Sequence, residues 1–145
     1  IFFRAVTMTF GCMVHLHLYD ITLGMANKFS PGLFGKSIDA IWHTGIVVYG
    51  KEYFFEGGIT CVPSATTRFG KPLRVLFLGV TEIPQSVFEQ WTMEAENQRY
   101  GPTAYHITKN NCNHFTMEAS KFLTGNTIPD YVVKLPEEIL ETPLG

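Results

Sequence analysis

The chain has 145 residues, 46% of them hydrophobic and 17% charged, and this composition is typical of one folded domain with a sizeable core. A formal net charge of -2, with lysine and arginine scattered along the chain, provides no basic surface for nucleic acid. No apolar run approaches the roughly 18 residues that span a bilayer, so no membrane span is expected. Cys12, Cys61 and Cys112 show no paired spacing, which favours a reducing compartment, cytosol or nucleus or both.

Residues 1–13 begin with an apolar run that Arg4 interrupts, and they lack an initiator methionine and a cationic start. We therefore expect an N-terminal extension here and not a signal peptide. The remainder, 14–145, contains no internal repeat, low-complexity run or linker. One domain of mixed α+β type is expected.

Apolar and polar residues alternate from Val14 to Tyr19, which predicts a half-buried strand. His15 and His17 fall on the polar side of this strand and are expected at the surface. The segment 20–30 holds enough apolar residues for a short helix, and Ser30-Pro31-Gly32 ends it.

Two neighbouring runs predict a β-hairpin, with strands over 42–49 and 52–55 and a turn at Gly50-Lys51. Because side chains alternate along a strand, His43 shares one face with Gly45, and Trp42 points to the other. A histidine beside a glycine has open space next to it. His43 is then either a core histidine satisfied by a backbone bond or a base for Cys112.

The next segment, 59–72, has the composition of a surface loop and is a candidate for substrate contact. A third apolar strand is expected over 74–80. Pro84 suits the first turn of a following helix, whose inner face is predicted to hold Val87, Phe88, Trp91 and Ala95. Two short turns or helices are expected between 128 and 140.

The most informative stretch is 110–115, Asn-Asn-Cys-Asn-His-Phe. The alternation over 104–108 predicts a short strand, and apolar residues at helical spacing from Phe115 predict a helix that stops at Gly125. Cys112 then lies at a helix N-terminus, where unpaired N–H groups and the helix dipole favour a thiolate. We expect a depressed pKa for Cys112 and a nucleophilic role, although a buried structural cysteine is the alternative.

A metal site is a weaker alternative, because there is no CxxC pair and the spacings match no common zinc motif. No metal and no cofactor are expected. The residues that could be drawn as zinc ligands are Cys12, His15, His17, Cys112 and His114.

Several stretches together strongly resemble the PPPDE family of permuted papain-fold peptidases, which includes the desumoylating isopeptidases. They are Leu18-Tyr19-Asp20, Ile41-Trp42-His43-Thr44, Ile46-Val47-Val48, Asn111-Cys112-Asn113, Phe122-Leu123-Thr124-Gly125, Ile128-Pro129, Leu135-Pro136 and Thr142-Pro143-Leu144-Gly145. The resemblance covers nearly the whole chain from about Val14 onward.

The resemblance implies a PPPDE peptidase domain over 14–145, with a small antiparallel sheet or barrel packed with helices and the catalytic cysteine at a helix N-terminus. Cys112 matches the family's nucleophile and His43 its base, in the chain order His then Cys. The backbone N–H of Cys112 is then the first donor to an oxyanion, and Trp42, Asn110 or Asn111 is expected to supply the second.

The resemblance also implies an isopeptidase that cuts the bond between the Gly-Gly end of a ubiquitin-like modifier and a lysine. SUMO conjugates are the expected substrates, with ubiquitin conjugates as the alternative. A homodimer with the active site in a groove between subunits is expected as well. Glu56 stands where relatives usually carry glycine, which puts the substrate preference in question.

Two other functions remain open. The same dyad can act on a thioester such as an S-acylated cysteine, because the same acyl-enzyme forms and a thiolate leaves more easily than an amine. A catalytically silent module that binds modifier tails is the second, although binding alone requires neither His43 nor Cys112.

Overall fold

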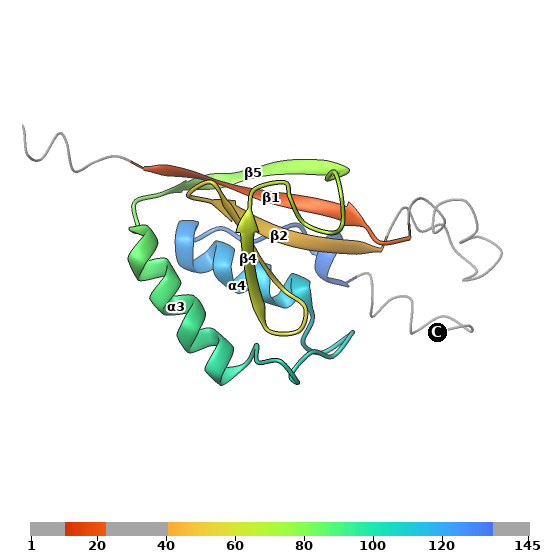
Figure 1. Ribbon diagram of the computed structural model, residues 1–145. Coiled ribbons are helices and arrows are strands. Elements are labelled where there is room, and N and C mark those ends of the chain that lie inside the picture. The colour runs from red at the N-terminus through yellow and green to blue at the C-terminus, as the bar shows by residue number, and fades with distance from the viewer. Residues whose placement is uncertain (1–10, 23–40, 135–145) are drawn as a thin grey trace, which may run out of the picture.

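The computed structural model describes residues 11–22 and 41–134, which form one antiparallel sheet and two long helices (Figure 1). The strands are β1 (Cys12–Asp20), β2 (Trp42–Val48), β3 (Lys51–Phe55), β4 (Ile59–Pro63) and β5 (Arg74–Thr81), in the order β4-β3-β2-β1-β5. The helices are α3 (Gln85–Gln98) and α4 (Cys112–Thr124). The predicted α+β class is confirmed. Neither helix has the length and apolar character needed to cross a bilayer.

The predicted hairpin forms between β2 and β3, with its turn one residue earlier than expected. Val48 pairs with Lys51, so Tyr49 and Gly50 make a two-residue turn. Both have positive φ, 58° and 73°, which matches the twist of the flanking strands. This turn sets the register that brings Glu52 opposite Val47.

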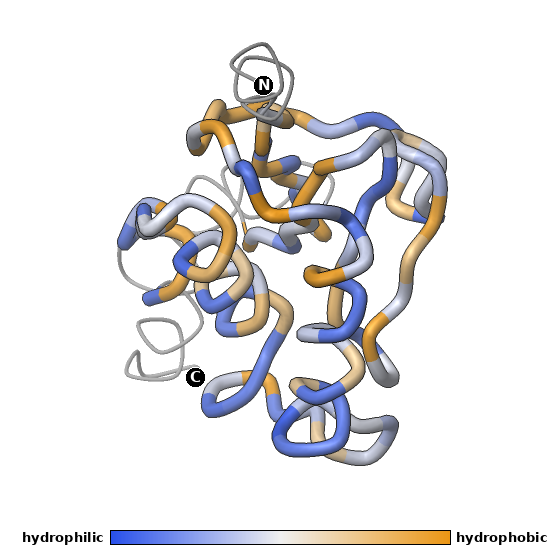
Figure 2. Tube along the Cα trace, turned by 90° about the vertical axis from the view of Figure 1, so that its left-hand side faces the viewer, coloured by the Kyte–Doolittle hydropathy of each residue, from blue (hydrophilic) through white to orange (hydrophobic). Residues whose placement is uncertain are grey.

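Both helices lie on one face of the sheet, with α4 across its middle (Figure 1). Hydrophobic and hydrophilic positions alternate around the helix coils in Figure 2, as expected for helices that cover a core. The core side chains between sheet and helices include Leu16, Leu18, Ile46, Tyr53, Phe55, Phe88, Phe115, Ala119 and Leu123. Phe88 and Ala95 of the predicted α3 inner face do face this core, whereas Val87 is 46% exposed. Gly125 ends α4 in the left-handed conformation, as predicted.

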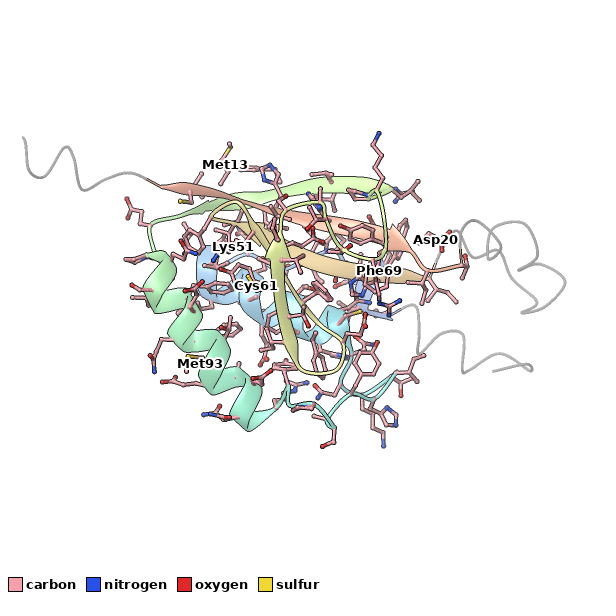
Figure 3. All side chains as sticks on the ribbon, viewed as in Figure 1. Met13, Asp20, Lys51, Cys61, Phe69 and Met93 are labelled. Atoms are coloured by element: carbon pink, nitrogen blue, oxygen red, sulfur yellow. The ribbon has the colours of Figure 1, made fainter. Side chains whose placement is uncertain are left out.

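Among residues 11–22 and 41–134, the other face of the sheet is covered only in part. The loop 64–73 folds over its β2–β3 side, where Phe69 stacks on His43 at 3.8 Å between ring centroids. The N–H of Ala65 in the same loop donates to Oε1 of Glu52 (3.2 Å). Nearer β5 none of the described residues covers this face, and Figure 3 shows Met13 projecting from it on the side away from the helices.

Three further expectations about the fold were wrong. The segment 104–108 is not a strand, because its backbone closes on itself in a single bridge between His106 and Asn110. Part of the expected loop 59–72 is strand β4. His17, expected at the surface, is buried and paired with Glu52. The expected helix over 20–30 and the turn over 135–140 lie outside the described residues, apart from 20–22.

Candidate active site

Cys112 is the first residue of α4, and a reciprocal capping box fixes its position. The Asn111 side chain accepts from the N–H groups of Asn113 (2.9 Å) and His114 (3.3 Å). In return the His114 ring accepts from the N–H of Asn111 (3.0 Å). Two of the N–H groups that a helix start leaves unpaired are thus satisfied by side chains.

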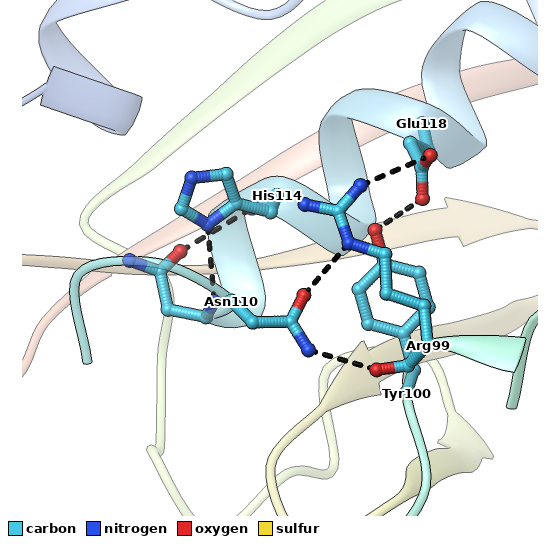
Figure 4. Close-up of polar contacts among 6 residues, drawn as sticks. Arg99, Tyr100, Asn110, His114 and Glu118 are labelled. Carbon is cyan, nitrogen blue, oxygen red and sulfur yellow. Dashed lines mark hydrogen bonds and ion pairs between the residues drawn. The ribbon is translucent and has the colours of Figure 1, made fainter. Parts of the chain in front are cut away.

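A polar network holds the turn before Cys112 against the rest of the molecule (Figure 4). The Arg99 side chain donates to the amide oxygen of Asn110 (3.0 Å), and its guanidinium also pairs with Glu118 (3.4 Å). The hydroxyl of Tyr100 donates to the same carboxylate. The end of α3 and the middle of α4 therefore both anchor the residue that precedes the Asn111 cap.

His43 lies near the start of β2, directly opposite Tyr19 of β1. It is only 5% exposed, because Phe69 stacks on one face of its ring and Phe54 meets it edge-on. The side chains of β2 alternate in the observed register, so His43 lies on the same face of the strand as Gly45, as predicted.

The residues that flank His43 bond directly to α4. The Thr44 hydroxyl donates to Oδ1 of Asn113 (2.6 Å), and Nδ2 of Asn113 donates to the carbonyl of Trp42 (3.1 Å). Asn113 follows Cys112 in the chain. A buried amide therefore ties the strand that carries His43 to the helix that carries Cys112.

A cavity of about 400 Å³ is lined by both His43 and Cys112. Trp42 and Asn111, two of the three predicted oxyanion donors, also line it. Asn110 does not contribute to its wall, since its amide group donates to the carbonyls of Arg99 (2.8 Å) and Ala104 (3.1 Å). The structure thus brings together four of the five predicted site residues.

The Cys112 thiol has a raised pKa, contrary to the sequence-based expectation. Burial raises the pKa, and it outweighs the backbone N–H of Thr44, the Tyr105 hydroxyl and the local N–H groups, all of which lower it. Desolvation penalises the charged form of any buried group. A helix N-terminus alone is therefore not enough to ionise this thiol.

Burial also lowers the pKa of His43 to about 4. The negative charge of Glu52 raises this pKa in part, and the charge of Arg68 lowers it further. Near pH 7 the unliganded site therefore holds a neutral imidazole and a neutral thiol. An imidazole of this kind can accept the thiol proton only as the sulfur attacks, which makes it a general base.

Glu52 is a buried carboxylate behind the site that sequence reasoning missed. It accepts from the Tyr19 hydroxyl (2.7 Å) and pairs with His17 (3.3 Å). Burial raises the pKa of Glu52. The hydrogen bonds from His17, Tyr19 and Ala65 lower it by more than burial raises it, so the pKa lies below the usual range. The space beside Gly45 that the sequence predicts is filled by this carboxylate, which would lie 2.6 Å from an added Cβ.

Tyr105 and Phe69 are two further site residues that the sequence did not single out, although Phe69 belongs to the segment 59–72 that is expected to contact substrate. Tyr105 lines the cavity seven positions before Cys112, but its segment was interpreted as a strand. Phe69 is the one aromatic residue of a loop otherwise typical of a surface. Only a tertiary fold brings either of them to the site.

A metal centre finds no support in the described ranges 11–22 and 41–134, where no three His, Cys, Asp or Glu side chains are grouped as ligands. Cys12 and Cys61 are exposed thiols, whereas Cys112 is buried. The zinc alternative therefore lacks a ligand cluster in this part of the chain.

Comparison with known proteins identifies the family of this chain. The family described as "PPPDE putative peptidase domain" matches residues 12–145. The chain is 39% identical over 135 residues to Desumoylating isopeptidase 1 of Xenopus laevis, covering 92% of this chain and 79% of that protein. It is 40% identical over 133 residues to Desumoylating isopeptidase 1 of Homo sapiens, covering 91% and 79%. With a family match over almost its full length, the chain belongs to the PPPDE peptidase family.

Proposed function

We propose that this protein is a cysteine isopeptidase that removes a ubiquitin-like modifier from lysines of target proteins. The modifier that we propose is SUMO. The observation that carries the proposal is that His43 and Cys112 line the same cavity. The relatives named Desumoylating isopeptidase 1 support the choice of modifier. Family membership implies the permuted papain-like fold.

In the proposed reaction, Sγ of Cys112 attacks the carbonyl carbon of the modifier's last glycine while His43 takes the thiol proton. The carbonyl π electrons move onto the oxygen, and they return as the C–N bond to lysine breaks. His43 gives its proton to the leaving amine. Water then attacks the thioester, again with His43 as base, and the thiol regains its proton from His43 as the C–S bond breaks.

The proposed machinery is a dyad. Nε2 of His43 is buried, and no side chain among the described residues hydrogen-bonds to it. A third residue that orients the imidazole, as in a triad, is therefore not part of the proposal. Packing by Phe69 and Phe54 supports a fixed ring orientation instead.

The rim of the cavity supports a substrate with a slender end. Glu56 and Arg68 both line the cavity and form an ion pair at 2.8 Å. A Gly-Gly tail has no side chains, so it can pass a narrow entrance that excludes bulkier sequences. Glu56 would thus restrict the entrance through its ion pair with Arg68.

A homodimer is also proposed, with β5 at its interface. β5 is an edge strand, and Leu73, Val75, Phe77 and Val80 of this region are each more than half exposed. Exposed strand edges and contiguous apolar patches are typical of surfaces that bind another chain.

The test is reaction of the full chain with SUMO and ubiquitin probes that carry an electrophile in place of the terminal glycine carboxylate. We expect a covalent adduct with the SUMO probe, mapped to Cys112 by mass spectrometry, and none with C112S, because a serine hydroxyl is barely ionised near pH 7. C61S, which removes an exposed thiol, is the control and should react like the wild type.

Other results would redirect the assignment. An adduct with the ubiquitin probe alone would make ubiquitin conjugates the substrate. Failure of both probes, from a folded chain whose Cys112 still reacts with a small alkylating agent, would favour the thioesterase. An undiminished adduct in C112S would exclude Cys112 as the nucleophile.

A further inference from the structure

A carbonyl attacked by Cys112 needs two preorganised donors for the oxygen that becomes negative. The first is available from the fold. Cys112 is the first residue of α4, so its backbone N–H has no acceptor within the helix. The following steps rest on the proposed acyl-transfer function and concern the second donor.

The side-chain amides near Cys112 are already used to hold the structure. Nδ2 of Asn111 donates to the carbonyl of Ile107 (2.7 Å). Nδ2 of Asn113 donates to the carbonyls of Trp42 and Val132, both at 3.1 Å. Nδ2 of Asn110 is likewise bound to two carbonyls. Both hydrogens of the Asn110 and Asn113 amides are donated, so either amide would have to break a hydrogen bond in order to serve an oxyanion. The Asn111 amide donates one hydrogen, and its oxygen holds the start of α4.

Trp42 lines the cavity, but its ring is also packed by residues that do not. The Arg74 guanidinium lies 5.0 Å from its ring centroid, and the Tyr131 ring meets it at 6.2 Å. Neither Arg74 nor Tyr131 lines the cavity. The packing partners of the Trp42 ring are therefore outside the site, whereas its carbonyl accepts from Nδ2 of Asn113.

The Tyr105 hydroxyl is the remaining candidate for the second donor to the oxyanion. It lines the cavity together with Cys112, and its hydroxyl is within hydrogen-bonding reach of both the thiol and the backbone N–H of Cys112. Its ring lies 5.2 Å from that of Phe55, which is fully buried. A rigid neighbour thus fixes the ring while the hydroxyl faces the reacting sulfur.

We propose that the Tyr105 hydroxyl is the second donor of the oxyanion hole, beside the backbone N–H of Cys112. The oxygen of the tetrahedral intermediate is attached to the carbon that bonds Sγ, so a donor next to both Sγ and this N–H is next to that oxygen. The hydroxyl turns its hydrogen from sulfur to oxygen, and no proton is transferred. Burial raises the pKa of Tyr105, which keeps the donor protonated over the working range of pH.

The test compares Y105F with the wild type in two reactions of Cys112. A Gly-Gly peptide aldehyde adds reversibly to the thiol and creates the oxygen that the donors bind, whereas iodoacetamide alkylates the thiol without creating one. We expect Y105F to weaken aldehyde affinity at least about tenfold and to change the alkylation rate less than about threefold. With a SUMO C-terminal aminocoumarin amide, kcat should fall about 100-fold and KM should change little.

Y131F is the matched control. Tyr131 is 44% exposed and Tyr105 41%, and the Tyr131 hydroxyl accepts from Arg74 (3.4 Å) outside the cavity. We expect Y131F to keep wild-type aldehyde affinity. Both variants retain the aromatic ring, and equal thermal unfolding midpoints would show that the fold is retained.

Three outcomes would overturn the assignment of Tyr105. They are unchanged aldehyde affinity in Y105F, an equal loss in the alkylation rate, or a selective loss of affinity in W42F but not in Y105F. The proposed function has a separate test, because a wild-type chain that binds the aldehyde but cleaves no SUMO amide would refute the isopeptidase and still decide the role of Tyr105.

Discussion

At the scale of single residues, the environment of Sγ in Cys112 combines opposite electrostatic effects. The N–H of Thr44, the Tyr105 hydroxyl and the start of α4 all favour a thiolate, yet burial keeps the pKa of the thiol above its usual value. Burial outweighs these donors while the thiol is at rest. They stabilise the reaction more strongly once a negative charge forms beside them. The site is thus better suited to a charged intermediate than to a charged resting state.

A pH profile of Cys112 alkylation tests this balance. Because burial raises its pKa, we expect the midpoint of the rate profile with iodoacetamide to lie above the ordinary thiol pKa of about 8.5. The cysteine of a short unstructured peptide with blocked ends, measured alongside, should reach its plateau first. The midpoint of the profile is the decisive quantity, because burial also slows the absolute rate, and peptide mapping separates Cys112 from the exposed Cys12 and Cys61.

A rate that already levels off below pH 7 would contradict this prediction. It would mean that a thiolate–imidazolium pair is formed in the unliganded site. Since burial lowers the pKa of His43 to about 4, such a pair would require His43 to hold a proton about three pH units above that value.

At the scale of elements, the first turn of α4 carries the site. Asn111 accepts two N–H bonds, and His114 accepts from the N–H of Asn111. The same turn presents the N–H of Cys112, which has no acceptor within the helix, and, through Asn113, holds β2. Stability and geometry therefore depend on the same few amides.

N111A should show this dependence. Loss of an N-cap side chain costs about 1 kcal/mol, and the bond to the carbonyl of Ile107 is lost as well, so we expect a decrease in the free energy of unfolding of about 1–2 kcal/mol by urea titration. The turnover of N111A should also fall, and by more than the small fraction of unfolded protein accounts for. N97A, an exposed change in α3, is the control and should stay within about 0.5 kcal/mol.

An N111A chain as stable as N97A would show that the capping box is not important for α4. Wild-type turnover in a destabilised N111A would show that the cap supports the helix without orienting Cys112. The two measurements thus separate the role of the cap in stability from its role in positioning.

The elements with regular periodicity were predictable and the irregular ones were not. Strand alternation predicted β1 and β2, and helical spacing with a terminal glycine predicted α4 and its end at Gly125. The alternation over 104–108 was misleading because a strand also needs a partner. There the N–H and carbonyl of His106 bond to Asn110 (both 3.0 Å), so the backbone is satisfied locally.

At the scale of the whole molecule, the site joins segments that are distant in the sequence. Alternation placed His43 on the correct side of its strand, but it could not show that Glu52 and Phe69 would close that side. Their approach depends on the register set by the Tyr49-Gly50 turn and on the path of the loop 64–73. The pKa of Cys112 is raised and not lowered for the same reason, since burial depends on the tertiary structure.

The two faces of the sheet also differ at this scale. Within the part of the chain that the structure describes, one face is covered by α3 and α4, and the other is covered by the loop 64–73 beside β2 and β3 (Figure 1). Near β5 the second face leaves Phe77 59% exposed. A patch of this kind at an unpaired strand edge is expected to associate in water.

The oligomeric state of F77E tests whether β5 forms the proposed dimer interface. The wild-type chain should sediment as a dimer at micromolar concentration, and a carboxylate at the centre of an apolar interface, which typically costs at least 2 kcal/mol, should raise the dissociation constant about 30-fold or more. M93E is the control, because Met93 is 63% exposed on α3 at the opposite side of the molecule (Figure 3) and should leave the dimer intact. A wild-type monomer, or an F77E chain that dimerises like M93E, would exclude β5 as the interface, because the substitution places a charge where an apolar partner would have to lie.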